Sequence, residues 1–195
     1  PWARSGVGAV SSQNVTLPSL GNQILDLLAS KGLSAEPALK AALETDEWRD
    51  YRQVTVVDNQ GQTAFFSGKE ALGIYNAVAG NQCVAAGNLL SDQSVIAAMV
   101  PAFENTSGEL ADRLLAAMQA AMDAGGEAGP VHSAALKIVG NVPWPIADLR
   151  VDWADEDPIG QLQGLWKAYQ PQMQDYLSRA LNPTVAPSYG VPGDE

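Results

Sequence analysis

A chain of 195 residues is long enough for one ordinary globular domain, which needs neither disulfides nor a structural metal for stability. The formal net charge of −11 disfavours nucleic acid and anionic lipid as partners, because their phosphate groups would be repelled. One cysteine and one histidine exclude an internal disulfide and the usual zinc ligand sets.

Membrane insertion and secretion are not expected either. No apolar run approaches the ~20 residues that a spanning helix requires. The first residues lack the apolar stretch of a signal peptide, so the expected location is the cytoplasm. Carboxylate sites for Mg²⁺ or Ca²⁺ stay open, but no motif supports them, and we expect no metal and no cofactor.

The first third of the chain predicts one strand followed by two helices. Residues 6–13 form a short apolar run typical of a strand. Thr16 and Pro18 offer a helix start, and apolar residues recur at helical spacing until Gly32 ends them. Ser34 is the expected N-cap of a second helix.

Beyond residue 51 the apolar pattern first takes the period of a strand and later returns to that of a helix. A turn that contains Gly61 separates two strand-like runs, which indicates a hairpin. This hairpin consists of residues 54–57 and 63–66, and a further strand is expected at residues 83–86. Two helices follow, one capped by Ser91 or Asp92 and the other by Ser107. The last expected elements are strands of residues 133–139 and 147–153 and a helix from Asp157-Pro158 to Leu181.

Strands grouped apart from paired helices favour an α+β fold with antiparallel sheets over alternating βα units. We expect two facing antiparallel sheets between helix layers, with a core that includes Leu114, Met118, Val54, Val56 and Leu136. Residues 1–181 would form one domain, and residues 182–195, rich in proline and glycine, an extended C-terminal arm.

No stock catalytic or nucleotide-binding motif is present in the chain. Cys83 lies in an apolar run, where an inert buried thiol is the expected state. His132 and Ser133 are adjacent on a predicted strand, so their side chains point to opposite faces and cannot act as a base and nucleophile pair. We therefore expect no catalytic triad within this chain.

Two places combine a strand end with an expected helix start, where backbone N–H groups and the helix dipole favour an oxyanion. One is the run Ser11-Ser12-Gln13-Asn14, and the other is Gly87-Asn88. Spacing alone leaves open whether these are ordinary caps and turns.

Five blocks in order along the chain resemble the signature blocks of the DUF1028 family. They are PWARSGVGAVSSQNV (1–15), CVAAGNLL (83–90), GGEAGPVHSAAL (125–136), DLRVDW (148–153) with DEDPIGQL (155–162), and PSYGVPGDE (187–195). The family is placed in the N-terminal-nucleophile hydrolase superfamily, so the resemblance implies a four-layer αββα sandwich and hydrolysis of a small amide or related C–N bond.

The resemblance also implies a segment before Pro1. Family members begin with two strands that precede the position of Pro1, and in this superfamily the first residue supplies both the nucleophile and, through its α-amine, the base. Proline has no hydroxyl or thiol. Either Pro1 follows a cleavage and a companion segment carries the nucleophile, or the sequence is incomplete; a member that never had a nucleophile fits less well.

The resemblance implies a site made by Ser12, Gln13, Gly87 and Asn88. The strand that ends at Gln13 would lie beside the nucleophile strand and supply the oxyanion hole, and Gly87-Asn88 would approach the nucleophile's amine. For His132, a role in the site and a structural role are both expected alternatives, and a structural histidine is at least as well supported. Arg150 and Asp152 are expected to form a surface ion pair.

Two functions are therefore expected as alternatives, an amide hydrolase and a catalytically silent binding or scaffold protein of the same fold.

The last expected helix carries Trp166, Tyr169, Met173 and Tyr176, which is more aromatic surface than one flank of a domain needs. We expect a homodimer in which this helix or the arm takes part.

Overall fold

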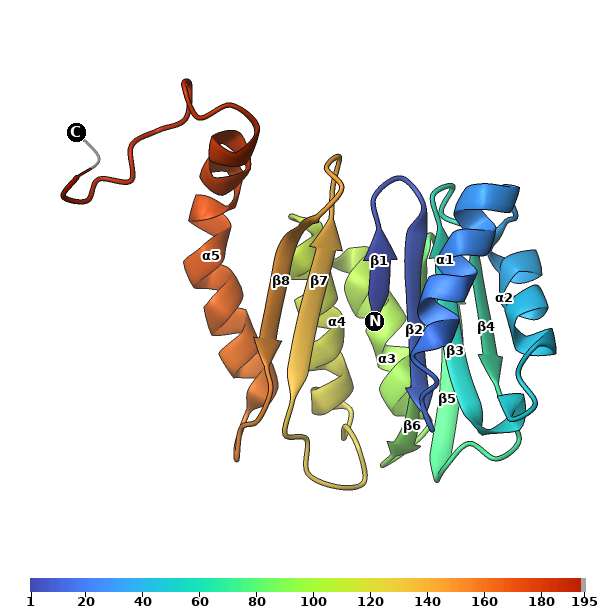
Figure 1. The fold of residues 1–195 in the computed structure, drawn as a ribbon. Helices are drawn as coiled ribbons and strands as arrows, with labels where there is room; N and C mark the ends of the chain where they lie inside the picture. Colours follow the sequence, from blue (N-terminus) through green and yellow to red (C-terminus); the bar gives the residue numbers. More distant parts are fainter. Residues whose placement is uncertain (194–195) are drawn as a thin grey trace.

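The computed structural model describes residues 1–193, which fold into antiparallel strands and helices (Figure 1). The helices are α1 (Ser19–Lys31), α2 (Ala35–Glu44), α3 (Ser94–Asn105), α4 (Leu110–Asp123) and α5 (Pro158–Leu181), with a short 3₁₀ turn at Arg49–Tyr51. The strands are β1 (Trp2–Arg4), β2 (Gly8–Asn14), β3 (Arg52–Asp58), β4 (Thr63–Ser67), β5 (Ile74–Gly80), β6 (Cys83–Leu90), β7 (Ala134–Val139) and β8 (Pro145–Val151).

Every strand pair in the described residues is antiparallel. Strands β1 to β4 form one sheet in sequence order, while β5 pairs with β6 and β7 pairs with β8 as separate hairpins. The mixed α+β class is therefore confirmed. The two continuous sheets that the sequence predicts are not completed by strands within residues 1–193.

Helices α1 and α2 cover one face of the four-stranded sheet (Figure 1). Val10, Val54 and Val56 project from neighbouring strands into an apolar cluster with Leu20 and other buried side chains of these helices. Such a cluster is the main stabilising contribution to this half of the molecule, at roughly 25 cal/mol per Å² of apolar surface removed from water.

The β5–β6 hairpin lies against the other face of this sheet, and α3 covers the hairpin from behind (Figure 1). Val95 and Ile96 of α3 pack with Val78 and Ala85 of the hairpin. A Cβ on Gly87 would lie 2.8 Å from Ile96 Cδ1 and 2.9 Å from Leu90 Cδ2, so a larger residue there would force the ends of these side chains to shift.

The β7–β8 hairpin packs on α4 and α5 through a third cluster that contains Leu136 and Leu162. Trp166 belongs to this cluster at 4% exposure, and its Nε1 donates to Asp112 Oδ1 (2.7 Å). The expectation that Trp166 adds to an exposed aromatic surface is wrong, because the ring fills the space between α4 and α5.

The expected helices, the expected strands and the β3–β4 hairpin are confirmed, with differences at their ends and two additional strands. β1 is only three residues long, and the apolar residues of β5 (IYNAVAG) do not alternate regularly with polar ones, so neither gives the pattern that predicts a strand. Val54, Val56 and Leu136 are buried, whereas Leu114 and Met118 are only half-buried.

The helix starts after β6 also differ from the expected caps. The N-cap of α3 is Gln93, although Asp92 accepts a hydrogen bond from the Ser94 amide (2.8 Å). The N-cap of α4 is Glu109, which forms a capping box with Asp112. Asp157 caps α5 as expected, by accepting from the Gly160 amide (2.9 Å).

The predicted C-terminal arm has no helix or strand in residues 182–193, and residues 194–195 lie outside the described part. Figure 1 shows that it runs from the end of α5 away from β7 and β8. The division into a domain of residues 1–181 and an arm stays a prediction.

A buried ion pair holds the connection between α2 and β3. Arg52 Nε donates to Asp46 Oδ2 (2.8 Å) and Arg52 Nη1 donates to the Val15 carbonyl (2.6 Å), with both charged groups almost fully buried. The hydrogen bond from Arg52 lowers the pKa of Asp46 below its usual value, against the opposing effect of burial.

Asp46→Asn should destabilise the fold by about 3 kcal/mol at pH 7, because Arg52 would keep a buried charge without its partner. A depressed folded-state pKa gives stability that is complete above the unfolded value of about 3.9 and is lost as pH falls through the folded value. Urea unfolding at several pH values should therefore show a constant difference from the wild type above about pH 5 that shrinks below about pH 4. A difference that does not depend on pH would contradict this account.

Candidate functional site

The end of β2 presents side chains to both faces of the four-stranded sheet. Ser12 is paired with Val54, so its side chain shares the face covered by α1 and α2. Gln13 is paired with Gln53 and points to the opposite face, toward β5 and β6. Ser12 and Gln13 therefore cannot present their side chains to the same site.

Gln53 connects the four-stranded sheet to the β5–β6 hairpin. Its side chain is 0% exposed, and its Oε1 accepts from Gln13 Nε2 (2.7 Å). Its Nε2 lies within hydrogen-bond distance of Ser67 Oγ (2.9 Å) and of the Gly87 (3.1 Å) and Asn76 (3.3 Å) carbonyl oxygens. One buried amide thus satisfies polar groups of β2, β4, β5 and β6.

A second polar contact joins the ends of β2 and β6. Asn14 Oδ1 accepts from Asn88 Nδ2 (3.3 Å) and from the Leu72 amide (3.1 Å), and Asn14 Nδ2 donates to the Tyr51 carbonyl (2.6 Å). The Leu72 carbonyl in turn accepts from the Leu89 amide (3.0 Å). We call the Gln13–Gln53–Gly87 and Asn14–Asn88 contacts together the β2–β6 polar network.

Backbone strain occurs at two residues of this region. Asn14 has φ 66° and Leu89 has φ 53°, both in the left-handed region. Leu89 is unusual there, since for a bulky side chain the conformation costs about 1–3 kcal/mol and persists only where neighbouring contacts enforce it. It lies at a bulge in the β5–β6 pairing, and its carbonyl accepts from the Ala128 amide (2.8 Å).

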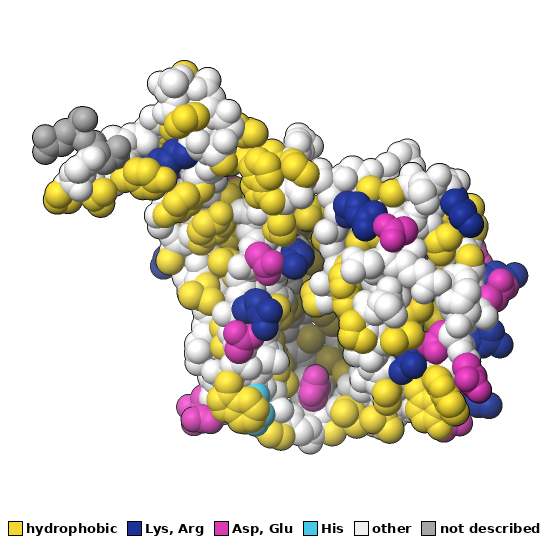
Figure 2. Space-filling view, viewed as in Figure 1, with side chains coloured by type: hydrophobic (Ala, Val, Ile, Leu, Met, Phe, Trp, Pro, Cys, Tyr) yellow, Lys and Arg dark blue, Asp and Glu magenta, His cyan; other side chains and the backbone are white. Residues whose placement is uncertain are grey.

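Three strand edges around this network have no ladder partner within residues 1–193. β1 pairs only with residues 8–10 of β2, which leaves the outer edge of residues 11–14 open. The outer edge of β6 forms one isolated bridge, Leu90 to Glu127, and β7 pairs only with β8. Figure 2 shows a hollow between the part of the molecule that contains β7 and β8 and the part that contains β1 to β4.

The structure brings three of the four predicted site residues into this network. Gln13 reaches the Gly87 carbonyl through Gln53, and Asn88 contacts Asn14. Ser12 Oγ faces α1 and α2 instead, 7% of Ser12 is exposed, and the hydroxyl is the one buried side-chain polar atom in the described part of the chain without a hydrogen-bond partner.

Gly87 and Asn88 do not lie at the start of a helix, contrary to the sequence prediction. These residues do not lead directly into a helix, because β6 continues to Leu90 and α3 begins only at Ser94. The dipole of α3 therefore does not act on Asn88 as expected, and what draws Asn88 toward Gln13 and Asn14 is the stacking of β6 on the sheet.

The other chemically reactive side chains make contacts that stabilise the fold and do not form a reactive pair. His132 Nδ1 carries its proton toward the Ala154 carbonyl (2.8 Å), and the ring stacks on Trp153 at a centroid distance of 4.2 Å. Burial, with a smaller contribution from Glu104, raises the pKa of the half-buried Cys83 thiol, which disfavours the nucleophilic thiolate. Arg150 and Asp152 form the expected exposed ion pair (Nε to Oδ1, 3.0 Å).

No group of three or more His, Cys, Asp or Glu side chains positioned for a metal ion occurs in residues 1–193. In the same range, no helix combines the length and apolar character needed to cross a membrane.

These features define a mixed α+β protein with antiparallel sheets and a polar network beside open strand edges. The chain belongs to the DUF1028 family, a family of unknown function whose model matches residues 1–162. Protein SPO2555 from Silicibacter pomeroyi, assigned to the same family, is 33% identical to it. The matched region covers 88% of this chain and 74% of that protein, with a TM-score of 0.79. No curated protein matches the chain.

Gln53 and the side chain of Asn14 are the parts of the network that the sequence pattern did not identify. A signal for Gln53 was present, because Gln53 and Thr55 alternate with Val54 and Val56 along the strand. Polar side chains on one face of two paired strands indicate that this face meets polar groups and not a dry core.

Gln53→Ala should destabilise the fold by about 2–4 kcal/mol, because the Gly87 and Asn76 carbonyls would lose a buried donor and a cavity would form. Urea unfolding measures the loss, and hydrogen exchange of β6 amides should accelerate most. Gln62→Ala, at an exposed turn position, is the matched control and should change stability by less than about 0.5 kcal/mol. Equal effects of the two changes would show that Gln53 does not connect the layers.

Proposed function

We propose that this chain forms the larger part of an N-terminal-nucleophile-type hydrolase that cleaves a small amide or related C–N bond through an acyl-enzyme intermediate. In this proposal, α1 with α2, the β1–β4 sheet, the β5–β6 and β7–β8 hairpins, and α3 with α4 correspond to the four layers of an αββα sandwich. The nucleophile belongs to a companion segment outside residues 1–195.

The observation that carries the proposal is the β2–β6 polar network beside open strand edges. A strand added along the outer edge of Ser11 to Asn14 would place its end residue close to Gln13, Asn14 and Asn88. Unpaired N–H and C=O groups of an edge strand are a ready template for such pairing. The strained Leu89 backbone next to Asn88 is a second support, since strain of this kind concentrates at functional sites.

In the proposed reaction, the hydroxyl or thiol of the companion's first residue attacks the substrate carbonyl carbon, and its proton passes to the adjacent α-amine. Outward-facing backbone amides at the end of β2 donate to the oxyanion, and the Asn88 side chain holds the α-amine. The α-amine then protonates the departing amine as the C–N bond breaks. Water hydrolyses the acyl-enzyme and restores the nucleophile.

Gln13 and Gln53 would act as positioning residues in this reaction. Their mutual hydrogen bond fixes the end of β2, and Gln53 holds the Gly87 carbonyl that precedes Asn88. Preorganised donors of this kind are effective because they need not reorient as charge develops.

Intact-mass measurement of the purified protein tests the companion segment. A second polypeptide that begins with Thr, Ser or Cys supports the hydrolase, because only such a residue offers both a nucleophile and a free α-amine. A preparation in which every species lacks such a terminus would sink the proposal.

Asn88→Ala in the complete protein should lower kcat by about 10² to 10³ for whichever member of a panel of small p-nitroanilides is hydrolysed, with little change in the melting temperature. Asn81→Ala, in the turn between β5 and β6, is the matched control and should leave the rate unchanged. An unchanged rate in Asn88→Ala would reduce Asn88 to a structural link between β6 and β2.

The alternative is a catalytically silent binding or scaffold protein with the same fold. It is favoured by the surroundings of Ser12, Cys83 and His132, none of which places a nucleophile beside a base in residues 1–193. The intact-mass measurement distinguishes the two functions, since a catalytically silent protein needs no terminal nucleophile.

A further inference from the structure

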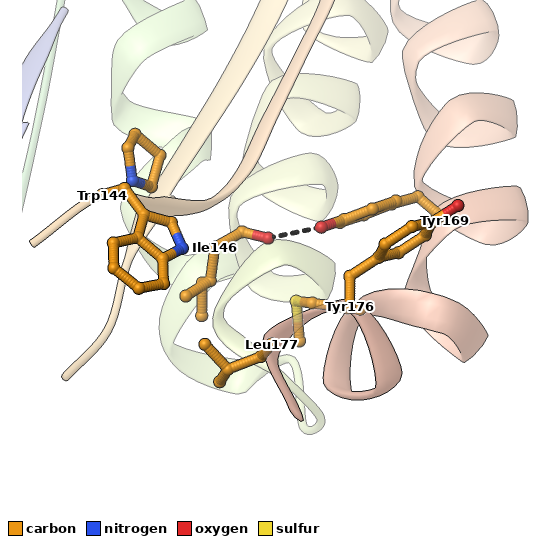
Figure 3. Close-up of a pocket in the computed structure, with 7 residues that line it drawn as sticks. Trp144, Ile146, Tyr169, Tyr176 and Leu177 are labelled. Carbon is orange, nitrogen blue, oxygen red and sulfur yellow. Dashed lines mark hydrogen bonds between the residues drawn. The ribbon is translucent and has the colours of Figure 1, made fainter. Parts of the chain in front are cut away.

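An apolar groove lies between the C-terminal half of α5 and the turn that leads into β8, away from the β2–β6 polar network. It has a volume of about 300 Å³. The residues that line it are Trp144, Pro145, Ile146, Tyr169, Met173, Tyr176 and Leu177 (Figure 3). Tyr169 donates its hydroxyl to the Ile146 carbonyl (2.8 Å), which fixes one wall of the groove and leaves its apolar side chains facing the opening.

Further apolar side chains around this groove are exposed in the part of the chain that the structure describes. Figure 2 shows hydrophobic side chains gathered over the C-terminal part of α5, the tail and the adjoining turn. Val185 is 74% exposed and Val191 is 55% exposed in the tail. An exposed apolar region of this kind on a globular protein marks an interaction surface.

The tail is held beside α5 with these valines outward. Arg179 Nη2 donates to the Pro187 carbonyl (2.8 Å), and its guanidinium lies 3.8 Å from the centroid of the Tyr189 ring. Tyr189 also approaches Tyr176 at a centroid distance of 6.3 Å. Within residues 182–193 the tail runs away from β7 and β8 (Figure 1), and none of these residues lines the groove of its own chain.

Charge distinguishes this surface from the rest of the protein. Residues 164–195 contain Asp175, Asp194 and Glu195 against Lys167 and Arg179, a net charge of −1, so residues 1–163 carry −10. Two copies that approach through other faces bring strong negative charge together, whereas approach through this surface avoids that repulsion. A basic partner, by contrast, would be attracted to the acidic faces.

We propose that this surface binds a second copy of the same chain in a twofold dimer, in which the tail of each copy lies in the α5 groove of the other. Each copy carries both the groove and an apolar tail beside it, which is the self-complementarity that an isologous contact requires. The dimer contact is separate from the proposed hydrolase site, so either can fail without the other.

Light scattering and sedimentation over a concentration series test the contact on the full chain. The wild type should be a dimer at micromolar concentration. Met173→Lys, which puts a charge in the groove, and Val191→Asp, which alters only the tail, should each raise the dissociation constant at least about 10-fold. Met122→Lys, an equivalent change at a half-exposed methionine of α4, is the matched control and should leave dimerisation unchanged.

Mixing the two variants distinguishes exchange of tails from other contacts. Met173→Lys keeps an intact tail and Val191→Asp keeps an intact groove, so a mixed dimer regains one of the two contacts that neither variant forms alone. The mixture should therefore dimerise more tightly than either variant. A monomeric wild type, a dimer that survives both changes, equal loss in Met122→Lys, or no gain on mixing would each overturn the proposal.

Discussion

The arrangement of the sheets depends on a single buried amide, that of Gln53. A glutamine at 0% exposure is tolerated only when its donors and acceptor are paired, and here the partners belong to four different strands. Because the Gly87 and Asn76 carbonyls accept from Gln53, the β5–β6 hairpin is fixed in one register against the sheet. A purely apolar contact between these layers would be less specific, since hydrophobic packing is not directional.

The polar side chain of Gln53 gives the four-stranded sheet two chemically different faces. Val10, Val54 and Val56 give the face under α1 and α2 a dry core, and Gln13 and Gln53 give the opposite face a polar character. The polar face is also the one beside the hollow and the open strand edges. Chemistry on this protein, if the proposed hydrolase function holds, would use backbone and amide donors held by the same contacts that join the layers.

The C-terminal region differs from the sheets in the kind of contacts that its side chains make. Trp166 anchors the first half of α5 in the core with a hydrogen bond to Asp112, whereas the second half carries its aromatic side chains toward an open groove. A low local charge in an otherwise acidic protein makes this the surface where a like copy meets the least repulsion. The site and the proposed contact surface therefore lie on separate parts of the fold.

The sequence by itself determined the class of fold and most of its elements. Periodic apolar residues with Gly32, Ser34 and Asp157 at helix ends predicted α1, α2 and α5, and the Gly61 turn predicted the β3–β4 hairpin. These features are local, because caps, turns and periodicity act over a few residues.

Tertiary structure alone decided how these elements combine. β5 is a strand because it pairs with β6 between α3 and the sheet, although its own sequence shows no regular alternation of apolar and polar residues. Gly87 and Asn88 have the composition of a turn, yet β6 continues through them because Gly87 pairs with Asn76 of β5 and Asn14 accepts from Asn88. Likewise, the resemblance to a family suggested that Gln13 and Asn88 approach one site, but only the register of β2 with β3 turned Ser12 away from it. The contacts that join β2 to β3 and to β6 link residues that are 40 and 74 positions apart, and no local pattern encodes them.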